Sequence, residues 1–432
     1  MNSLQSLQLR LTQQINAYQP DGTDPELVVF TAQTGFTGSL LAWLKAQSCY
    51  PHFYLQLRDE QTPVCEQIAS LGQVRAFDSA AQAQAFVNQS DLTLVGGTTF
   101  AGKTKFYLPR LLLILQHGQL RVTAFLDRKR DITAEKQRLA EILKTLKNST
   151  ALSPVQQKAS LLKKTAGQAE WCAWVEKALA HIEAGKFTKV VLANESVFST
   201  ETPINPVDFI AESREKNTGC YHFLWAENAR CCFIGSTPER LYAREGLILH
   251  TEALAGTAFM GEDESQNRRQ SQWLLHDEKN DYENQLVVED ICGNLSAFCQ
   301  QIDVSAVELK QLRRVQHLRR NIFARLNENL ADECCLNAIH PTAAVAGLPR
   351  RAAQRFLAET ENFDRSWYAG TLGFMSRRKA EFCVTIRSAF IEQNRIRVFA
   401  GAGIVAGSVP LLEWREIERK ASGLLSLLQS GE

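Results

Sequence analysis

The stretch Ala400-Gly-Ala-Gly-Ile-Val-Ala-Gly-Ser-Val-Pro-Leu-Leu-Glu-Trp-Arg-Glu-Ile-Glu-Arg-Lys420 predicts a strand, a glycine-rich turn and a helix. Ser408 is expected to cap the helix, and Pro410 fits its first turn, where a missing N–H does little harm. Glu413, Glu416 and Lys420 recur at helical spacing, so their side chains share one face. The turn and this charged face therefore lie close together.

The glycines of this turn indicate an anion site. Gly401 and Gly403 allow close approach of a ligand, and their backbone N–H groups can bind an anion. Carboxylates beside such an anion would repel it unless a cation lay between them. This arrangement favours Mg²⁺, which takes one or two carboxylates and keeps several waters. A plain surface ion pair between Glu416 and Lys420 is the alternative.

The composition excludes several classes of protein. The chain has 432 residues, of which 45% are hydrophobic, so it can form a large core. Its 48 Lys and Arg residues balance 47 Asp and Glu residues, which argues against nucleic-acid binding through overall charge. No apolar run long enough for a membrane span and no signal-peptide pattern occur, so we expect no membrane partner. The 11 scattered cysteines favour reduced thiols in a cytoplasmic protein.

Two titratable residues stand at strand positions. Lys189 alternates with apolar residues in the strand expected over Phe187 to Ala193. It either reaches solvent at a sheet edge or is buried, where it is more easily deprotonated and could act as a base. In the turn Gly235-Ser-Thr-Pro-Glu-Arg240, Pro238 fixes the backbone just before Glu239. An ion pair between Glu239 and Arg240 is the alternative to a functional role.

Two further segments carry charges that could face inward. Residues 264–300 are acidic and predict one or two helices, and one or two of their carboxylates, if turned inward, could join Glu416 in a metal site. Residues 381–390 predict one strand, with Arg387 on the face of Cys383 and Thr385. A buried arginine is costly unless it meets an anion, so Arg387 is a candidate anion ligand.

Several blocks, taken together, resemble the chorismate-utilising enzymes, which include isochorismate synthase, salicylate synthase, anthranilate synthase component I and aminodeoxychorismate synthase. The blocks cover residues 187 to 425 in family order. They are Lys189 in TKVVLA, Gly235-Ser-Thr-Pro-Glu-Arg240, Glu252-Ala-Leu-Ala-Gly-Thr257, Glu283 in YENQLVVEDI, His340-Pro-Thr, Tyr368-Ala-Gly370, Arg387, and GAGIV with EWREIERK. The segments VQHLRR and HPTAAVAGLPR are most similar to bacterial isochorismate synthases of the menaquinone pathway.

The resemblance implies a Mg²⁺-dependent isomerisation of chorismate to isochorismate, in which water adds at ring C2 while the C4 hydroxyl leaves. It implies that Lys189 is the base that activates the water and that Glu239 is the acid that protonates the departing hydroxyl. It also implies a metal site made by Glu283 and Glu416, with Glu413 nearby through water.

The resemblance further implies the residues that bind the substrate. These are Leu254, Ala255, Gly256, Thr257, His340, Tyr368, Arg387, Ala402, Gly403 and Lys420. Aminodeoxychorismate synthases carry a lysine at the place of Ala255, and its absence here favours water as the nucleophile. Salicylate synthase, which adds a pyruvate-lyase step, and an isochorismate synthase of a siderophore pathway are the alternative enzymes. A non-catalytic ligand-binding relative is the alternative from another class.

The implied architecture is α+β, with two large, mostly antiparallel sheets packed together, helices outside and the active site between the sheets. A soft boundary near Ser153-Pro154 separates residues 1–155 from a chorismate-binding catalytic region, residues 156–432. The N-terminal region is expected to contribute to the same α/β body. Chorismate is the expected partner, and monomer and homodimer both stay open.

Overall fold

Strand β5 (Thr104–Gln116) joins the two halves of the molecule in the computed structural model, which describes residues 3–21, 25–58, 66–328 and 331–428. One edge of β5 pairs with β3 (Gln67–Phe77). The other edge pairs with β4 (Leu94–Thr98) and then with β6 (Gln119–Asp127), which in turn pairs with β1 (Leu27–Gly35). Two arms of strands start from this junction, and every strand pair in the described chain is antiparallel.

The first arm runs from β3 through β2, β9, β10, β19 and β20 to β8, which also carries β7 and β16. Its strands are β2 (His52–Gln56), β9 (Tyr221–Ala226), β10 (Cys232–Thr237), β19 (Ser388–Glu392), β20 (Arg395–Ile404), β8 (Lys189–Thr200), β7 (Ala159–Lys164) and β16 (Gly347–Leu348). Strand β20 is the strand predicted before the glycine turn, but it continues to Ile404, so Gly401 and Gly403 lie in the strand and not in the turn as expected. Lys189 opens β8.

The second arm runs from β4 through β17, β18, β11 and β12 to β15, on which β13 and β14 lie. Its strands are β17 (Thr371–Met375), β18 (Lys379–Val384), β11 (Arg240–Glu245), β12 (Ile248–Phe259), β15 (Val315–Leu326), β13 (Cys299–Val304) and β14 (Glu308–Gln311). The predicted α+β class with mostly antiparallel sheets is confirmed, and the two sheets prove to be arms of one hydrogen-bonded network.

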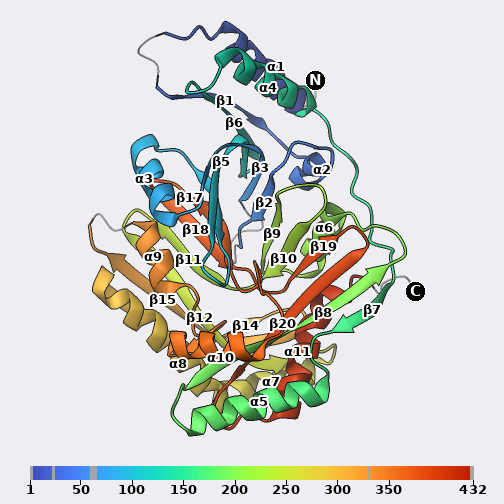
Figure 1. Cartoon of the computed structure of the whole chain (residues 1–432), viewed down its shortest axis with the longest axis vertical. Coiled ribbons are helices and arrows are strands. Elements are labelled where there is room, and N and C mark those ends of the chain that lie inside the picture. Colours follow the sequence, from blue (N-terminus) through green and yellow to red (C-terminus); the bar gives the residue numbers. More distant parts are fainter. Residues whose placement is uncertain (1–2, 22–24, 59–65, 329–330, 429–432) are drawn as a thin grey trace.

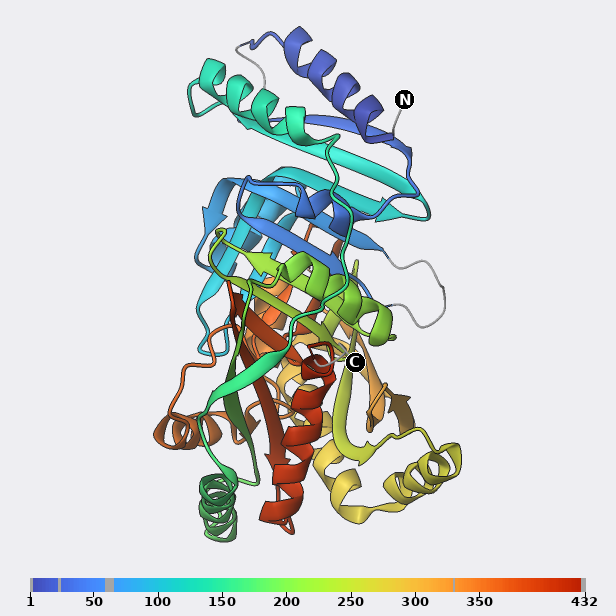
Figure 2. The same ribbon diagram turned by 90° about the vertical axis from the view of Figure 1, so that its right-hand side faces the viewer.

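Helices cover the outside of this network (Figure 1). They are α1 (Ser3–Ala17), α2 (Leu40–Lys45), α3 (Ala80–Ser90), α4 (Ile132–Thr145), α5 (Gln168–Glu183), α6 (Pro206–Lys216), α7 (Glu264–His276), α8 (Glu278–Leu295), α9 (Asp332–Ile339), α10 (Arg350–Thr360), α11 (Pro410–Leu425) and the 3-10 helix Ser296–Phe298. In Figure 2, α1 and α4 lie together on β1 and β6 at the top, and α11 stands below them. Within the described ranges, no helix has the length and apolar character to cross a membrane.

Three large apolar clusters hold the layers together. The largest includes side chains from both arms, among them Phe53, Trp225, Tyr242 and Phe382. A second lies under α1, α2, α4 and α6, where helix α1 buries the leucines that recur at helical spacing along one face. A third fixes α5, α10 and α11 against β8 and β20. Because β8 and β20 are supported from outside by this cluster, their inner faces are held in place beside the second arm.

The expectation that Ser408 caps the helix after the glycine turn is wrong. Ser408 does not cap α11, since the helix begins at Pro410 after Val409 and has no side-chain cap. The Ser408 hydroxyl instead accepts a hydrogen bond from the Val405 N–H at 3.2 Å and closes the turn. Such a local bond competes with the capping geometry for the same oxygen. The prediction that Pro410 lies in the first turn is confirmed.

The single strand expected over residues 381–390 is also wrong, because β18 ends at Val384 and β19 begins at Ser388. Between the two strands, Arg387 has a φ of 50°, in the left-handed region that few non-glycine residues adopt. The alternation of a continuous strand is therefore lost at Thr385 to Arg387. This break separates the direction of the Arg387 side chain from that of the strand before it.

Candidate active site

A cavity lies between the two arms. One wall comes from β8 and β20, through Val191, Phe399 and the backbone at Gly401 and Gly403. The opposite wall comes from residues 254–257 of β12 and from the turn before β11. Charged and aromatic side chains complete the lining, namely Glu239, Glu283, His317, Tyr368, Arg387 and Lys420. The cavity thus collects most of the residues that the sequence singled out.

Glu239 lies at the cavity wall in the short turn between β10 and β11. It is 4% exposed, and no described side chain or backbone group forms a hydrogen bond or ion pair with its carboxyl group. Burial raises the pKa of Glu239 to about 8, and the nearby Glu252 charge acts in the same direction. The alternative pairing with Arg240 is wrong, since that guanidinium bonds Tyr221 and His250. Glu239 therefore keeps its proton at neutral pH.

Lys189 is fully buried, so the alternative of a lysine reaching solvent at a sheet edge is wrong. Its Nζ lies 3.1 Å from Glu283 Oε1 and forms no hydrogen bond with the described residues. Lys189 lies directly behind Glu283, which lines the cavity, and has no surface on the cavity itself. The Lys189 charge lowers the pKa of Glu239, whereas burial raises it. The two groups therefore lie close enough to influence each other electrostatically.

Two glycines of β20 make room for these side chains. A Cβ atom on Gly403 would lie 2.2 Å from Glu283 Oε1 and 3.1 Å from Lys189 Cε. A Cβ atom on Gly401 would lie 2.8 Å from the Leu192 carbonyl oxygen and 3.0 Å from Tyr368 Oη. At Gly401 a backbone carbonyl stands in the way of any Cβ atom, and at Gly403 the Glu283 carboxylate would have to move, so both positions favour glycine.

Helix α11 presents its predicted charged face to the same region. Lys420 Nζ lies 2.6 Å from Glu416 Oε1 and donates a hydrogen bond to the Gly401 carbonyl at 3.0 Å. The alternative ion pair between Glu416 and Lys420 thus exists, but Lys420 also bonds the Gly401 backbone of β20 at the cavity wall. Burial acts to raise the pKa of Glu416, yet Lys420, Lys279 and Arg387 together lower it. Burial and the Glu416 charge raise the pKa of Glu413 to about 7.

The three candidate metal carboxylates each lie beside a lysine. Lys189 contacts Glu283, Lys279 contacts Glu413 at 2.9 Å, and Lys420 contacts Glu416. Glu283 lines the cavity, while Glu413 and Glu416 line an adjoining groove that shares Thr257 with it. Over the described residues, no three potential ligand side chains converge into a ready-made metal cage. The donors fit Mg²⁺, which needs one or two carboxylates and fills its remaining positions with water and substrate oxygens.

The β12 wall contains a bulge at Gly256. Its register with β15 shifts between Ala255 and Thr257, and Gly256 has a φ of 79°. The Thr257 N–H donates to Asn280 Oδ1 at 3.1 Å, which ties the bulge to helix α8. Small side chains and backbone therefore face the cavity from Leu254 to Thr257.

Arg387 and Tyr368 form the cationic and aromatic end of the cavity. Tyr368 stacks on Phe399 with ring centroids 5.0 Å apart, and burial raises the pKa of its phenol to about 12. Arg387 is held by a residue that the sequence reasoning missed, because its Nη2 lies 3.4 Å from His317 Nε2. His317 Nδ1 donates to the Gly256 carbonyl at 3.2 Å, so the neutral ring leaves Nε2 as an acceptor for the arginine.

Two predicted substrate residues do not reach the cavity. His340 lies behind it, and its Nε2 bonds the Ala369 carbonyl at 3.1 Å, so the ring supports a lining residue. Burial lowers the pKa of His340 to about 4, which keeps the ring neutral. The Ala402 side chain belongs to the apolar cluster under α5 and α11, on the other face of β20 from the cavity. Only its backbone is available to a ligand.

Comparison with known proteins adds to this geometry. A family model described as chorismate binding enzyme matches residues 97–429. The isochorismate synthase MenF of Pasteurella multocida (strain Pm70) is 55% identical over 438 residues, covering 100% of both chains. The protein of the same name from Escherichia coli (strain K12) is 40% identical over 394 residues, covering 90% of each chain.

Solved structures agree with these sequence matches. The structure of MenF, the menaquinone-specific isochorismate synthase from Escherichia coli, superposes with a TM-score of 0.92 and 38% identity, covering 99% of this chain and 100% of that chain. Anthranilate synthase component I from Streptococcus pneumoniae TIGR4 superposes with a TM-score of 0.63 and 20% identity over 94% of each chain, and so shares the fold.

Proposed function

The chain belongs to the chorismate-binding enzyme family, and we propose that it converts chorismate to isochorismate for menaquinone synthesis. The observation that carries this proposal is the Glu239 carboxyl group, which has a pKa of about 8 and lines the cavity. Two cations, Arg387 and Lys420, line the same cavity. A protonated carboxyl at neutral pH is suited to donate a proton to a leaving hydroxyl. A protein that only binds its ligand would have no use for such a proton donor.

In the proposed reaction, a water oxygen bonds to ring C2, the ring double bonds shift, and the bond from C4 to its hydroxyl oxygen breaks. Hydroxide is a poor leaving group, so Glu239 gives its proton to the C4 oxygen and water departs. We assign the removal of a proton from the attacking water to Lys189, which meets the cavity only through its contact with Glu283. One water enters and one leaves, so the reaction is an isomerisation.

Binding the substrate requires positive charge, because chorismate carries two carboxylates. We assign the enolpyruvyl carboxylate to Arg387 and Tyr368, and the ring carboxylate to Lys420 and the backbone of Gly401 to Gly403. Leu254, Ala255, Gly256 and Thr257 form the wall beside the ring. Ala255 offers no amine, which supports water as the nucleophile. His340 and Ala402 act on this site only through their neighbours and backbone.

We also propose that the reaction depends on Mg²⁺, held by Glu283 and Glu416 with Glu413 nearby through water. When bound, the ion supplies positive charge that neutralises the ring carboxylate of the substrate. The electrostatic coupling of Glu413 to Glu416 and Glu283 supports a shared site, since these charges repel one another without a cation. The ten described cysteines are free thiols, which supports a cytoplasmic location.

Product analysis tests this proposal directly. Purified protein is incubated with chorismate and Mg²⁺, and the products are separated by liquid chromatography. Isochorismate alone is the expected product. Salicylate with pyruvate would identify a salicylate synthase, and unchanged chorismate would identify a ligand-binding relative. Chelation with EDTA should stop turnover and added Mg²⁺ should restore it, whereas turnover after exhaustive chelation would overturn the metal assignment.

A further inference from the structure

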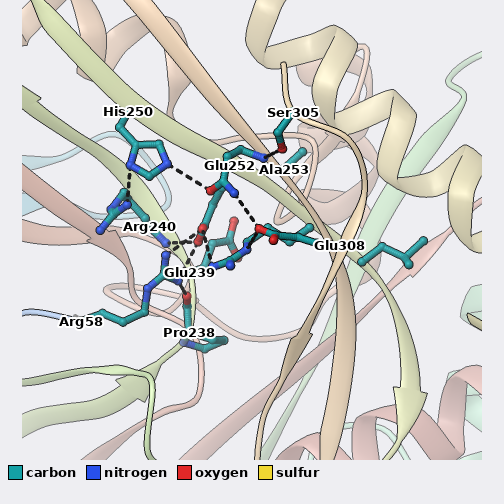
Figure 3. A network of polar contacts seen from close by, with 12 residues as sticks. Arg58, Pro238, Glu239, Arg240, His250, Glu252, Ala253, Ser305 and Glu308 are labelled. Carbon is teal, nitrogen blue, oxygen red and sulfur yellow. Dashed lines mark hydrogen bonds and ion pairs between the residues drawn. The ribbon is translucent and has the colours of Figure 1, made fainter. Parts of the chain in front are cut away.

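We propose that the buried ion pair between Arg58 and Glu252 is a clamp that positions the Glu239 carboxyl group for proton donation. The proposal rests on the function proposed above. Arg58 comes from the N-terminal region, in which the sequence shows no catalytic constellation, and Glu252 lies in β12. Figure 3 shows the two side chains facing each other next to Pro238 and Glu239.

The ion pair is fully formed and buried. Arg58 Nη1 donates to Glu252 Oε1 at 2.8 Å, and Nη2 donates to Oε2 at 2.7 Å. The two side chains are 2% and 0% exposed. Such a two-pronged contact fixes the relative orientation of both groups as well as their distance. The pair is therefore a rigid support inside the protein.

This support holds the peptide groups on both sides of Glu239. Arg58 Nη1 also donates to the Pro238 carbonyl oxygen, which belongs to the peptide before Glu239. Glu252 Oε1 accepts the N–H of Arg240, which belongs to the peptide after Glu239, at 2.9 Å. That same peptide offers its carbonyl to the Val384 N–H at 3.1 Å. With both flanking peptides fixed, the backbone of Glu239 keeps one orientation, and so does the Cα–Cβ bond from which its side chain leaves the turn.

The charges of the pair suit this role. Burial would raise the pKa of Glu252, but the Arg58 charge brings it down to about 2, so the carboxylate stays ionised and keeps its hold. The Glu252 charge raises the pKa of Glu239, and the Arg58 charge lowers it in turn. A buried carboxylate without its arginine would be strongly unfavourable. Arg58 thus allows Glu252 to be charged next to a group that must keep its proton.

The position of Arg58 explains how the N-terminal region takes part in the site. Arg58 follows β2 directly, and the Leu57 N–H before it donates to the Glu66 carbonyl at 2.9 Å, at the start of the β2–β3 hairpin. Because β2 also pairs with β9, the hairpin is aligned with the catalytic part of the first arm. Strand pairing therefore sets where Arg58 meets the turn that carries Glu239.

The test is a double-mutant cycle that joins Arg58→Met with Glu239→Gln. Arg58→Met should lower kcat by about 10- to 100-fold, because a misplaced proton donor slows the chemical step, and should leave KM for chorismate within about twofold. In the Glu239→Gln background, Arg58→Met should cause no further loss. Arg58→Lys, which keeps the charge but lacks the fork, should recover part of kcat.

The matched control is Arg244→Met, which breaks an equally buried pair with two contacts of 2.7 Å to Asp332 outside the cavity lining. It should lower the melting temperature without changing kcat of the folded protein. An unchanged kcat in Arg58→Met, a rise confined to KM, or an equal loss in the Glu239→Gln background would overturn the clamp. If Arg58→Met does not fold, Glu252→Gln must show the same loss of kcat and the same non-additivity. Absence of isochorismate from the wild-type enzyme would instead overturn the proposed function.

Discussion

The carboxyl group of Glu239 is set apart from its neighbours by the lack of a cation in contact with it. Glu283, Glu413 and Glu416 each lie within 3.1 Å of a lysine, whereas Glu239 has only distant lysines and a nearby carboxylate, Glu252. Burial without a direct partner favours the neutral form of a carboxylic acid. Two carboxyl groups, Glu283 beside its lysine and Glu239 without one, thus line the same cavity in different electrostatic surroundings.

The first prediction concerns the proton on Glu239. Glu239→Gln should lower kcat by about 100-fold or more, while KM changes little, because the amide keeps the shape but gives no proton. In the wild type, kcat should fall as the pH rises through about 8, since the raised pKa keeps the acid protonated below that value and ionised above it. The Gln variant should lack this alkaline limb. A wild-type rate in the variant would remove Glu239 from the mechanism.

The second prediction concerns His317, which accepts from Arg387 and donates to Gly256. His317→Asn should raise KM for chorismate by about 5- to 20-fold with a small change in kcat, because Arg387 loses one of the groups that hold it toward the substrate. Steady-state kinetics measures both constants. His117→Asn, in the exposed turn between β5 and β6, is the control. An unchanged KM in His317→Asn would show that Arg387 needs no such support.

Single residues could be predicted where a sequence pattern marks them. Lys189 stands out as a charge within a strand, and Glu416 and Lys420 share a helical face. Arg58 and His317 belong to no sequence pattern that would single them out. Arg58 meets Glu252 across 194 residues, and His317 meets Arg387 across 70, so only the folded chain shows their partners. Long-range contacts of this kind leave no local periodicity.

Among the elements, β20 depends most on its glycines, because a side chain at these positions would collide with neighbouring residues. Gly403→Ala would bring a methyl group to 2.2 Å from Glu283 Oε1, so the carboxylate must move. We expect kcat to fall by about 100-fold and the apparent affinity for Mg²⁺ to weaken, measured by titrating the metal in the product assay. Gly423→Ala in α11 is the control, because open space surrounds it and alanine favours a helix. A fully active Gly403→Ala variant would show that Glu283 is free to move.

The elements themselves could be predicted where periodicity is strong, as in β20, the start of β8 and the helices within residues 264–300. The expectations failed where tertiary contacts decide a backbone angle. Arg387 adopts its left-handed φ between two strands that a simple alternation would join. Ser408 closes a turn in place of capping a helix. In both cases the local sequence allowed two geometries, and neighbours selected one.

At the scale of the molecule, the antiparallel α+β class could be expected, but the junction at β5 could not. That junction depends on which strands meet, and β4 meets β17 across 273 residues at Thr98 and Thr371. The division into residues 1–155 and 156–432 stays a prediction about sequence regions. In the structure, each arm contains strands of both regions, which pair as β2 with β9 and as β4 with β17.

The fourth prediction follows from these shared arms. A fragment of residues 156–432, expressed alone, should aggregate or lack a cooperative unfolding transition, because it loses the partners of β9 and β17 and uncovers the largest apolar cluster. Circular dichroism on thermal melting and size-exclusion chromatography measure this. A soluble fragment with one sharp transition would show that the catalytic region folds without the N-terminal strands.

The pairing of β4 with β17 also affects how the protein is made. Translation proceeds at about 5–20 residues per second, so the nascent chain carries β4 for roughly 15 to 55 s before the ribosome has synthesised its partner. During that interval the strand edge and the aromatic surface beneath it are open to other newly made chains. Chaperones that shield such edges are therefore expected to raise the yield of this enzyme in the cell.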